Sequence, residues 1–136
     1  MTEQEKREIA ENFLRGLRNQ DGSLLRSIMA DEVVWSLPGA SLMSGEAHGV
    51  DAILKRAATL AGFSVKIELQ YVIFGLHDVA VQLHNTGRSD GKVLDEHLTT
   101  VIHLDGRKIQ RLDTFISDVA MLNAYFVQEP TDELGR

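Results

Sequence analysis

Hydrophobic residues follow a helical spacing at the start of the chain. Ile9, Phe13 and Leu17 are four residues apart, so they lie on one face of an amphipathic helix. Thr2 and Glu5 precede them at the spacing of a capping box, in which both side chains bond free N–H groups of the first turn. The pattern therefore predicts a first helix that buries this face.

Two further helices and one strand are predicted before the middle of the chain. A short helix carrying residues of Leu24–Met29 follows a break at Asp21-Gly22. Residues 32–37 then read as a short strand stopped by a Pro-Gly turn, and the Ser- and Gly-rich stretch 40–49 reads as a loop. A third helix runs through Ala52–Leu60, where apolar residues lie on adjacent turns.

The period changes in the second half, where apolar and polar residues alternate as in half-buried strands. Four such segments follow one another, at 63–75, 78–87, 92–104 and 108–117. Asp105-Gly106, between the last two, is a strong hairpin signal. A last helix is predicted after Ser117, its expected cap. We therefore predict an α+β fold in which a curved antiparallel sheet wraps over the N-terminal helices.

Length and composition narrow the possible functions. A chain of 136 residues fits a single domain, predicted over 1–128, with a polar and frayed tail over 129–136. The net charge of -6 argues against nucleic acid and against anionic membranes as partners. There is no cysteine, which excludes disulfides, thiolate nucleophiles and cysteine-based zinc sites. The charged beginning of the chain has no apolar signal region, so we expect a cytoplasmic protein.

Four segments together resemble one known family. They are "WSLPG", "SGEAHGVDAI", "DGRKIQRLDTF" and "SDVAMLNAYF", and with the order of the elements they resemble the SnoaL-like branch of the nuclear transport factor 2-like superfamily from about Glu5 to Phe126. The resemblance implies a cone-shaped α+β barrel that encloses a pocket, usually in a homodimer. The superfamily includes steroid isomerases, polyketide cyclases, epoxide hydrolases and dehydratases, so the fold does not select a reaction.

Two specific activities of that superfamily are not matched. The ketosteroid isomerases carry a base aspartate on the short strand before a Pro-x-Gly turn, where this chain has no carboxylate between Trp35 and Pro38. The limonene epoxide hydrolases carry an Arg-x-Asp pair, where this chain has Leu83 and Asn85. The polyketide cyclases and some dehydrochlorinase-like members use a His and an Asp in the pocket, and both residue types are present here.

The candidate pair is His97 and Asp113, and its formation depends on strand register. We expect a first hairpin turn centred near Ser89, which places Val81 beside His97 and makes the His97 face of its strand the pocket face. A two-residue turn at Asp105-Gly106 would then direct Asp113 away from the pocket, whereas a longer turn or a bulge would bring it inward. Both registers stay open. The opposite face of the sheet is expected to be buried in a homodimer.

An inward Asp113 would give coherent chemistry. A carboxylate bonded to one imidazole nitrogen makes the other nitrogen of His97 a better base, with Asp95 as a less favoured orienting partner. His103 lies six residues away, about 20 Å along a strand, too far to share a metal with His97. We therefore expect no metal, and no cofactor because no phosphate-binding fingerprint surrounds the glycines. The side chains expected to bind ligand are Trp35, Tyr71, Val81, Leu83, Asn85, Asp95 and Thr99.

Three functional hypotheses follow from these patterns. The first is a cofactor-independent enzyme that acts by proton transfer on a small, largely apolar organic molecule, as an isomerase, cyclase, dehydratase or hydrolase. The second is a non-catalytic protein that binds such a molecule around a neutral polar anchor. The third is a dimeric interaction module, which predicts a pocket already filled by side chains and a large exposed apolar patch.

Overall fold

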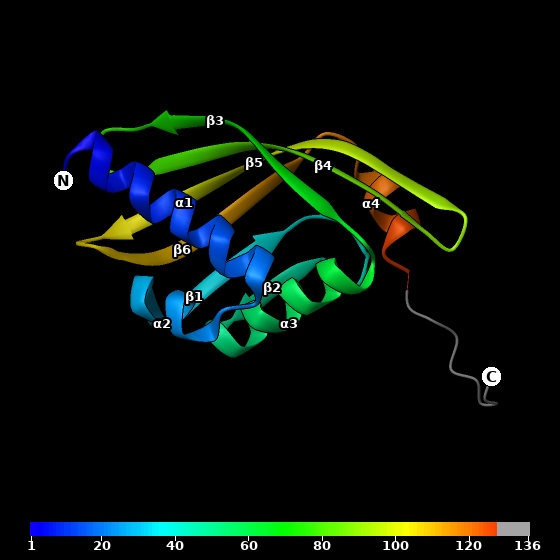
Figure 1. The fold of residues 1–136 in the computed structure, drawn as a ribbon, viewed down its shortest axis with the longest axis horizontal. Coiled ribbons are helices and arrows are strands. Elements are labelled where there is room, and N and C mark those ends of the chain that lie inside the picture. The colour runs from blue at the N-terminus through cyan, green and yellow to red at the C-terminus, as the bar shows by residue number, and fades with distance from the viewer. Residues whose placement is uncertain (128–136) are drawn as a thin grey trace.

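A curved six-stranded sheet and four helices make up the computed structural model, which describes residues 1–127 (Figure 1). The helices are α1 (Glu3–Asn19), α2 (Gly22–Ile28), α3 (Gly49–Gly62) and α4 (Val119–Tyr125). The strands are β1 (Met29–Leu37), β2 (Gly45–His48), β3 (Lys66–Phe74), β4 (Val79–Ser89), β5 (Lys92–Asp105) and β6 (Lys108–Ile116). The predicted α+β class is confirmed. The tail expected over 129–136 lies outside the described residues.

The sheet order is β2-β1-β6-β5-β4-β3, and the sheet is mixed. β1 pairs in parallel with β6, while the other neighbouring strands are antiparallel, so the expectation of a wholly antiparallel sheet was wrong at one position. The missed strand β2 lies in the predicted loop 40–49, where it extends the sheet beside β1. No helix in the described part of the chain has the length and apolar character needed to cross a membrane.

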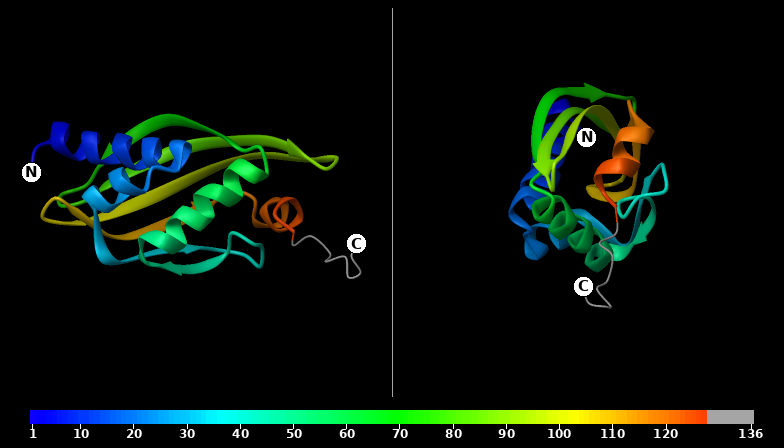
Figure 2. Two further views of the ribbon diagram at one scale, coloured as in Figure 1. Left: turned by 60° about the horizontal axis from the view of Figure 1, so that its bottom comes forward. Right: turned by 90° about the vertical axis from the view of Figure 1, so that its right-hand side faces the viewer.

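The sheet curves around α1 and α3, and the hydrophobic core lies between them (Figure 2). Ile9, Phe13 and Leu17 of α1 are buried, as their spacing predicts. The predicted capping box is also present, since Thr2 accepts from the Glu5 N–H and the Glu5 carboxylate accepts from the Thr2 N–H. Helix α1 therefore follows its sequence pattern closely.

The first hairpin differs from the expected register. Its turn is formed by Asp90 and Gly91, both with positive φ (53° and 76°), which is characteristic of the two-residue hairpin turns that match strand twist. Ser89 consequently faces Lys92, and Leu83 lies beside Leu98. The pairing of β4 with β5 is therefore shifted by an odd number of residues from the pairing expected for a turn centred on Ser89. Because side chains alternate along a strand, an odd shift exchanges the two faces of β5 relative to β4.

A bulge in β3 reverses a second set of side chains. The pairing with β4 shifts between Leu69 and Tyr71, leaving Gln70 as the extra residue. Tyr71, expected to bind ligand in the pocket, therefore points to the opposite face of the sheet from Leu69 and is 64% exposed. Val72 takes the inward position instead, beside Val81 of β4.

The second hairpin contains the bulge that the sequence left open. Its turn consists of Gly106 and Arg107, between the paired residues Asp105 and Lys108, and the register shifts so that Gln110 is the extra residue. Asp113 lies beside Val101 and so shares a face with His97. The β4–β5 register, however, makes this common face the outer one.

Helix α4 and the loop after β1 meet at one end of the molecule. Asp118, rather than the expected Ser117, caps α4 by accepting from the Met121 N–H. The Leu42 N–H donates to the Phe126 carbonyl at 3.0 Å, and the Ala40 N–H donates to Asn123 Oδ1 at 2.8 Å. These bonds close the end of the core on which the candidate site is built.

Gly87 of β4 is required by close packing against this end of the molecule. A Cβ atom at Gly87 would lie 2.7 Å from the Tyr125 hydroxyl oxygen and 2.9 Å from the Ser64 carbonyl oxygen, both too close for a carbon. We expect Gly87→Ala to reduce the free energy of unfolding by about 1–3 kcal/mol, as overpacking does. Urea denaturation measures this loss. Gly62→Ala is the matched control, because nothing lies within 4 Å of its Cβ position, and its stability should be unchanged or higher.

Candidate functional site

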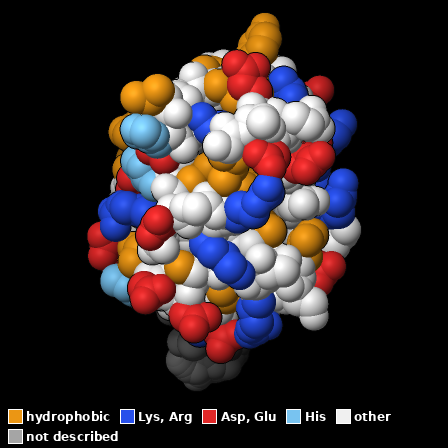
Figure 3. Space-filling view, turned by 90° about the vertical axis from the view of Figure 1, so that its left-hand side faces the viewer, with side chains coloured by type: hydrophobic (Ala, Val, Ile, Leu, Met, Phe, Trp, Pro, Cys, Tyr) orange, Lys and Arg blue, Asp and Glu red, His pale blue; other side chains and the backbone are white. Residues whose placement is uncertain are grey.

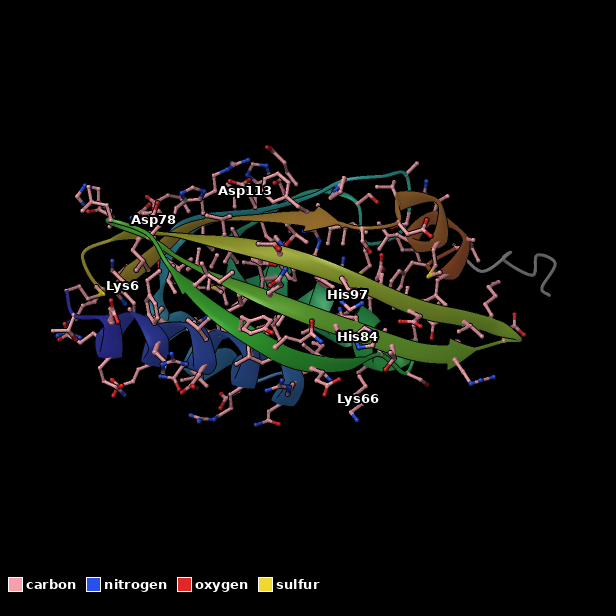
Figure 4. All side chains as sticks on the ribbon, turned by 90° about the horizontal axis from the view of Figure 1, so that it is seen from above. Lys6, Lys66, Asp78, His84, His97 and Asp113 are labelled. Atoms are coloured by element: carbon pink, nitrogen blue, oxygen red, sulfur yellow. The ribbon has the colours of Figure 1, made fainter. Side chains whose placement is uncertain are left out.

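The proposed pair of His97 and Asp113 is not formed. The His97 ring stacks on the His84 ring with centroids 4.5 Å apart on the outer face of β4 and β5. Asp113 lies farther along that face, where it accepts from Ser36 Oγ at 2.6 Å and bonds His103 Nε2 at 2.9 Å (Figure 4). The inward orientation expected for His97 was wrong, because the Asp90-Gly91 turn directs the other face of β5 inward. Asp113, whose orientation was left open, also lies on the outer face.

The residues expected to bind ligand divide between the two faces of the sheet. Trp35, Leu83 and Asn85 line an internal cavity, and Val81 is buried in the core on the same face of β4. The other three lie on the outer face: Tyr71, Thr99 and Asp95. The last of these bonds His84 Nε2 at 2.6 Å and does not reach the cavity.

The cavity lies between α1, the sheet and α4. Its wall is apolar except for a few side chains, and its lining includes Phe13, Leu17, Trp35, Leu37, Met43, Leu60, Ile67, Leu83, Asn85, Glu96, Leu98, Thr100, Ile116, Leu122 and Phe126. The free volume is about 30 Å³, far below the roughly 300–1,000 Å³ of pockets for drug-sized ligands. A ligand of several carbon atoms must therefore displace side chains as it enters.

One end of the cavity wall is formed near α4. Met43 from the loop after β1, Leu122 from α4 and Phe126 behind it all line the cavity and are at most 3% exposed. The loop is bonded to this end through the Ala40 N–H, which donates to Asn123 Oδ1, and the Leu42 N–H, which donates to the Phe126 carbonyl.

Two polar side chains, Asn85 and Glu96, stand side by side in the apolar wall. They are direct partners on β4 and β5 and are 8% and 2% exposed. Asn85 Oδ1 and Glu96 Oε1 are buried without a hydrogen-bond partner among the described residues. Leaving a buried acceptor unbonded costs about 1–3 kcal/mol of stability. Packing alone therefore does not explain why these two side chains lie in the apolar wall.

The environment of Glu96 favours its protonated form. Burial raises the pKa of Glu96 from 4.5 to about 7, because an apolar surrounding disfavours the charged carboxylate, and the negative charge of Asp118 raises it further. No arginine or lysine in the described structure bonds Glu96. A carboxyl group in this state exchanges its proton near neutral pH, which is the condition for efficient general acid–base catalysis.

A hydrogen-bonded chain across β1, β6 and β5 supports another part of the cavity wall. Trp35 Nε1 donates to Thr114 Oγ1 at 2.8 Å, and the hydroxyl oxygens of Thr114 and Thr100 are 2.7 Å apart. Arg56 holds Trp35 from behind, since Nη1 donates to the Trp35 carbonyl at 2.8 Å and the guanidinium carbon lies 5.1 Å from the ring centroid. Burial lowers the pKa of Arg56 to about 10, so it stays charged at neutral pH. Trp35 is therefore fixed in one orientation.

Glu96 was missed by the sequence analysis, although the sequence contained a signal for it. On β5, Glu96 shares a face with Leu94, Leu98, Thr100 and Ile102, which is the more apolar of the two faces. The more apolar face of a strand is usually the buried one, so a glutamate in its middle indicates a buried carboxyl group. The description of the chain through Val127 contains no group of three or more His, Asp or Glu side chains that could hold a metal ion.

The comparisons with known proteins identify the fold. No family model matches the sequence, and no curated protein matches it. Solved structures do match. A nuclear transport factor 2-like protein from Burkholderia xenovorans has a TM-score of 0.79 at 21% identity, over 92% of this chain and 98% of that one.

Two further structures come from proteins named for small-molecule chemistry or solved with a ligand. A protein described as a SnoaL-like polyketide cyclase, from a Jannaschia species, has a TM-score of 0.68 at 18% identity over 92% of this chain and 95% of that one. TerC, co-crystallised with polyporic acid, has a TM-score of 0.70 at 18% identity over 86% and 97%. Identities this low show the fold alone, and the chain has the nuclear transport factor 2-like fold, which the SnoaL-like proteins share.

Proposed function

We propose that the protein binds a small, largely apolar organic molecule in the cavity and that Glu96 exchanges a proton with it. The observation that carries this proposal is the buried Glu96 carboxyl group, which lacks a hydrogen-bond partner among the described residues and has a pKa near neutrality. Isomerisation, cyclisation, dehydration and hydrolysis all use such a group. The names of the SnoaL-like cyclase and of the ligand in TerC support a small organic molecule as the class of ligand.

The proposed roles follow from position. Glu96 is the acid or base, since it is the one titratable residue in the lining given above. Asn85, its cross-strand neighbour, orients the bound molecule through its amide group. Trp35 provides an aromatic wall whose indole N–H is already occupied by Thr114, so its contribution to the ligand is its apolar face.

A second candidate function is binding without catalysis, and the size of the cavity favours it. A free volume of about 30 Å³ leaves little room for a substrate to move between reactant and product geometries. A binder would use Asn85 and Glu96 as hydrogen-bonding anchors, with no requirement that Glu96 change its protonation state.

We also propose that two copies of the chain associate through the outer face of the sheet. Tyr71, Gln82, Thr99 and Phe115 form one row across four strands, because each pairs with the next. Tyr71 and Phe115 are 64% and 61% exposed, and Ile73 in the adjacent row is 47% exposed. Large apolar side chains gathered on an exposed sheet face favour a protein partner. By contrast, positive and negative side chains are interspersed on the end of the molecule shown in Figure 3.

The raised pKa of Glu96 predicts a specific pH dependence of stability. In the unfolded chain this carboxyl group loses its proton near 4.5, whereas in the folded protein it keeps the proton to about 7. Between these values the folded state binds more protons, so stability falls as pH rises and the loss is complete above about 7. We expect the wild type to lose about 3 kcal/mol relative to Glu96→Gln between about pH 4 and pH 8.

Urea unfolding at several pH values measures this difference. Glu32→Gln serves as the control, because Glu32 is exposed on β1 and its replacement should leave the pH profile of the wild type intact. A wild-type profile that runs parallel to that of Glu96→Gln would show that Glu96 ionises normally.

Proton transfer can be tested without knowing the natural substrate. The protein is incubated in D₂O with a panel of small apolar ketones, alcohols and amines, and exchange of the protons next to the ketone carbonyls is followed by NMR. We expect catalysed exchange for at least one ketone, with a rate that depends on one ionisation near pH 7. Glu96→Gln should lower the rate about 10²–10⁴-fold, the usual contribution of a general acid or base.

Ligand-induced shifts of Trp35 and Leu83 signals in the same samples separate the two candidate functions. Binding without exchange supports the non-catalytic binder. Absence of both binding and exchange across the panel contradicts a small-molecule function.

The proposed dimer predicts a change of assembly when the outer face becomes charged. We expect the wild type to sediment as a dimer and the double variant Tyr71→Lys/Phe115→Lys to sediment as a monomer, because buried lysines oppose association. Leu76→Lys is the control, since Leu76 is 87% exposed but lies in the turn after β3 and outside the sheet. A monomeric wild type in sedimentation velocity at micromolar concentration would overturn the dimer.

A further inference from the structure

Two hydrogen-bond acceptors in the cavity wall have no partner among the described residues. Asn85 Oδ1 and Glu96 Oε1 are both buried and unbonded, and they come from directly paired residues of β4 and β5. The indole N–H of Trp35 is occupied by Thr114. A ligand that carries N–H or O–H groups satisfies the two free oxygens, whereas a carbonyl or carboxylate of the same shape leaves them unbonded.

The distribution of charge around the cavity favours a cation. Glu96 lines it, and the negative charge of Asp118 acts on Glu96 from the start of α4. The lining given above contains no lysine, arginine or histidine. The nearby Arg56 has its guanidinium N–H groups bonded to the carbonyls of Trp35 and Gly45, behind the indole ring. A positive ligand therefore meets a carboxyl group in the lining and no cation there.

Aromatic rings complete a suitable environment. Trp35 and Phe13 are in edge-to-face contact with centroids 5.9 Å apart, and Phe126 lies in the wall formed by the end of the molecule near α4. The face of an aromatic ring attracts a cation, and the attraction is stronger where water is excluded. The remaining wall is aliphatic and suits an apolar body.

We infer that the ligand of this cavity is a small apolar amine, bound as the ammonium ion with its N–H groups donating to Glu96 and Asn85. The inference rests on the proposed small-molecule function and names the chemical class of its ligand. In the complex the ammonium ion and the Glu96 carboxylate form an ion pair, in which the hydrogen bond is charge-assisted.

Binding of the ammonium ion has a consequence for protons in solution. Free Glu96 is largely protonated at pH 6, and an adjacent cation favours its ionised form. Amine binding at pH 6 therefore releases a proton, while binding at pH 8.5 releases almost none. A neutral ligand of the same shape does not favour the ionised form of Glu96, so its binding at pH 6 releases no proton.

The test uses three ligands of nearly equal size: benzylamine, benzyl alcohol and benzoate. Binding is followed by the fluorescence of Trp35, which is the only tryptophan, and by calorimetry at pH 6 in two buffers of different ionisation enthalpy. We expect benzylamine to bind about 10- to 100-fold more tightly than benzyl alcohol, the difference that one charge-assisted hydrogen bond makes, and benzoate to bind most weakly.

Two variants link this preference to the cavity. Glu96→Gln should remove the advantage of benzylamine over benzyl alcohol and abolish proton release. Glu32→Gln, on the exposed part of β1, should behave as the wild type in all three titrations. A benzylamine preference that survives Glu96→Gln would overturn the inference, because the amine would then be bound elsewhere.

The outcomes separate this inference from the proposed function. If benzyl alcohol binds as tightly as benzylamine, or if benzylamine binds without proton release, the amine class is wrong and the small-molecule function stands. If none of the three ligands binds, the amine inference fails, and the wider exchange panel decides the proposed function independently.

Discussion

The two-residue turn at Asp90-Gly91 decides which face of the sheet encloses the cavity. Both residues have positive φ, which an Asp-Gly pair adopts readily and which matches the twist of the flanking strands. The turn places Ser89 opposite Lys92, and every later pair follows, including Asn85 with Glu96. A register different by one residue would bring His97 inward and expose Glu96, so the chemistry of the cavity depends on this local backbone preference.

The position of Glu96 is costly for the fold, and no structural gain offsets the cost. Holding its pKa at about 7 lowers the stability at high pH by about 3 kcal/mol, out of the roughly 5–15 kcal/mol typical of a whole domain. Leucine at this position would pack against Leu98 without such a loss. Local rules are usually broken at functional sites, where a group is kept for its chemistry. The unbonded oxygen of Asn85 beside Glu96 has the same interpretation.

Features set by nearby residues were predicted correctly, whereas side-chain orientations that depend on strand register were not. The capping box of α1 and its buried face follow from spacing alone, since helix periodicity does not depend on distant residues. Tyr71 could not be placed correctly, because one extra residue at Gln70 reverses the alternation, and a bulge leaves no clear mark in the sequence. The first hairpin was predictable in principle. Asp90-Gly91 is as strong a turn signal as Asp105-Gly106, and applying it to both hairpins would have directed Glu96 inward.

His97 was the expected acid–base group, whereas the structure gives Glu96 a pKa near neutrality. Histidine is the usual candidate because its unperturbed pKa is about 6.5. The described structure leaves all five histidines at least partly exposed; His84, for example, bonds Asp95 and stacks on His97. Burial in an apolar wall instead brings a glutamate into the same pKa range. In this fold strand register decides which side chain is buried, and burial rather than residue type brings the Glu96 carboxyl group into this pKa range.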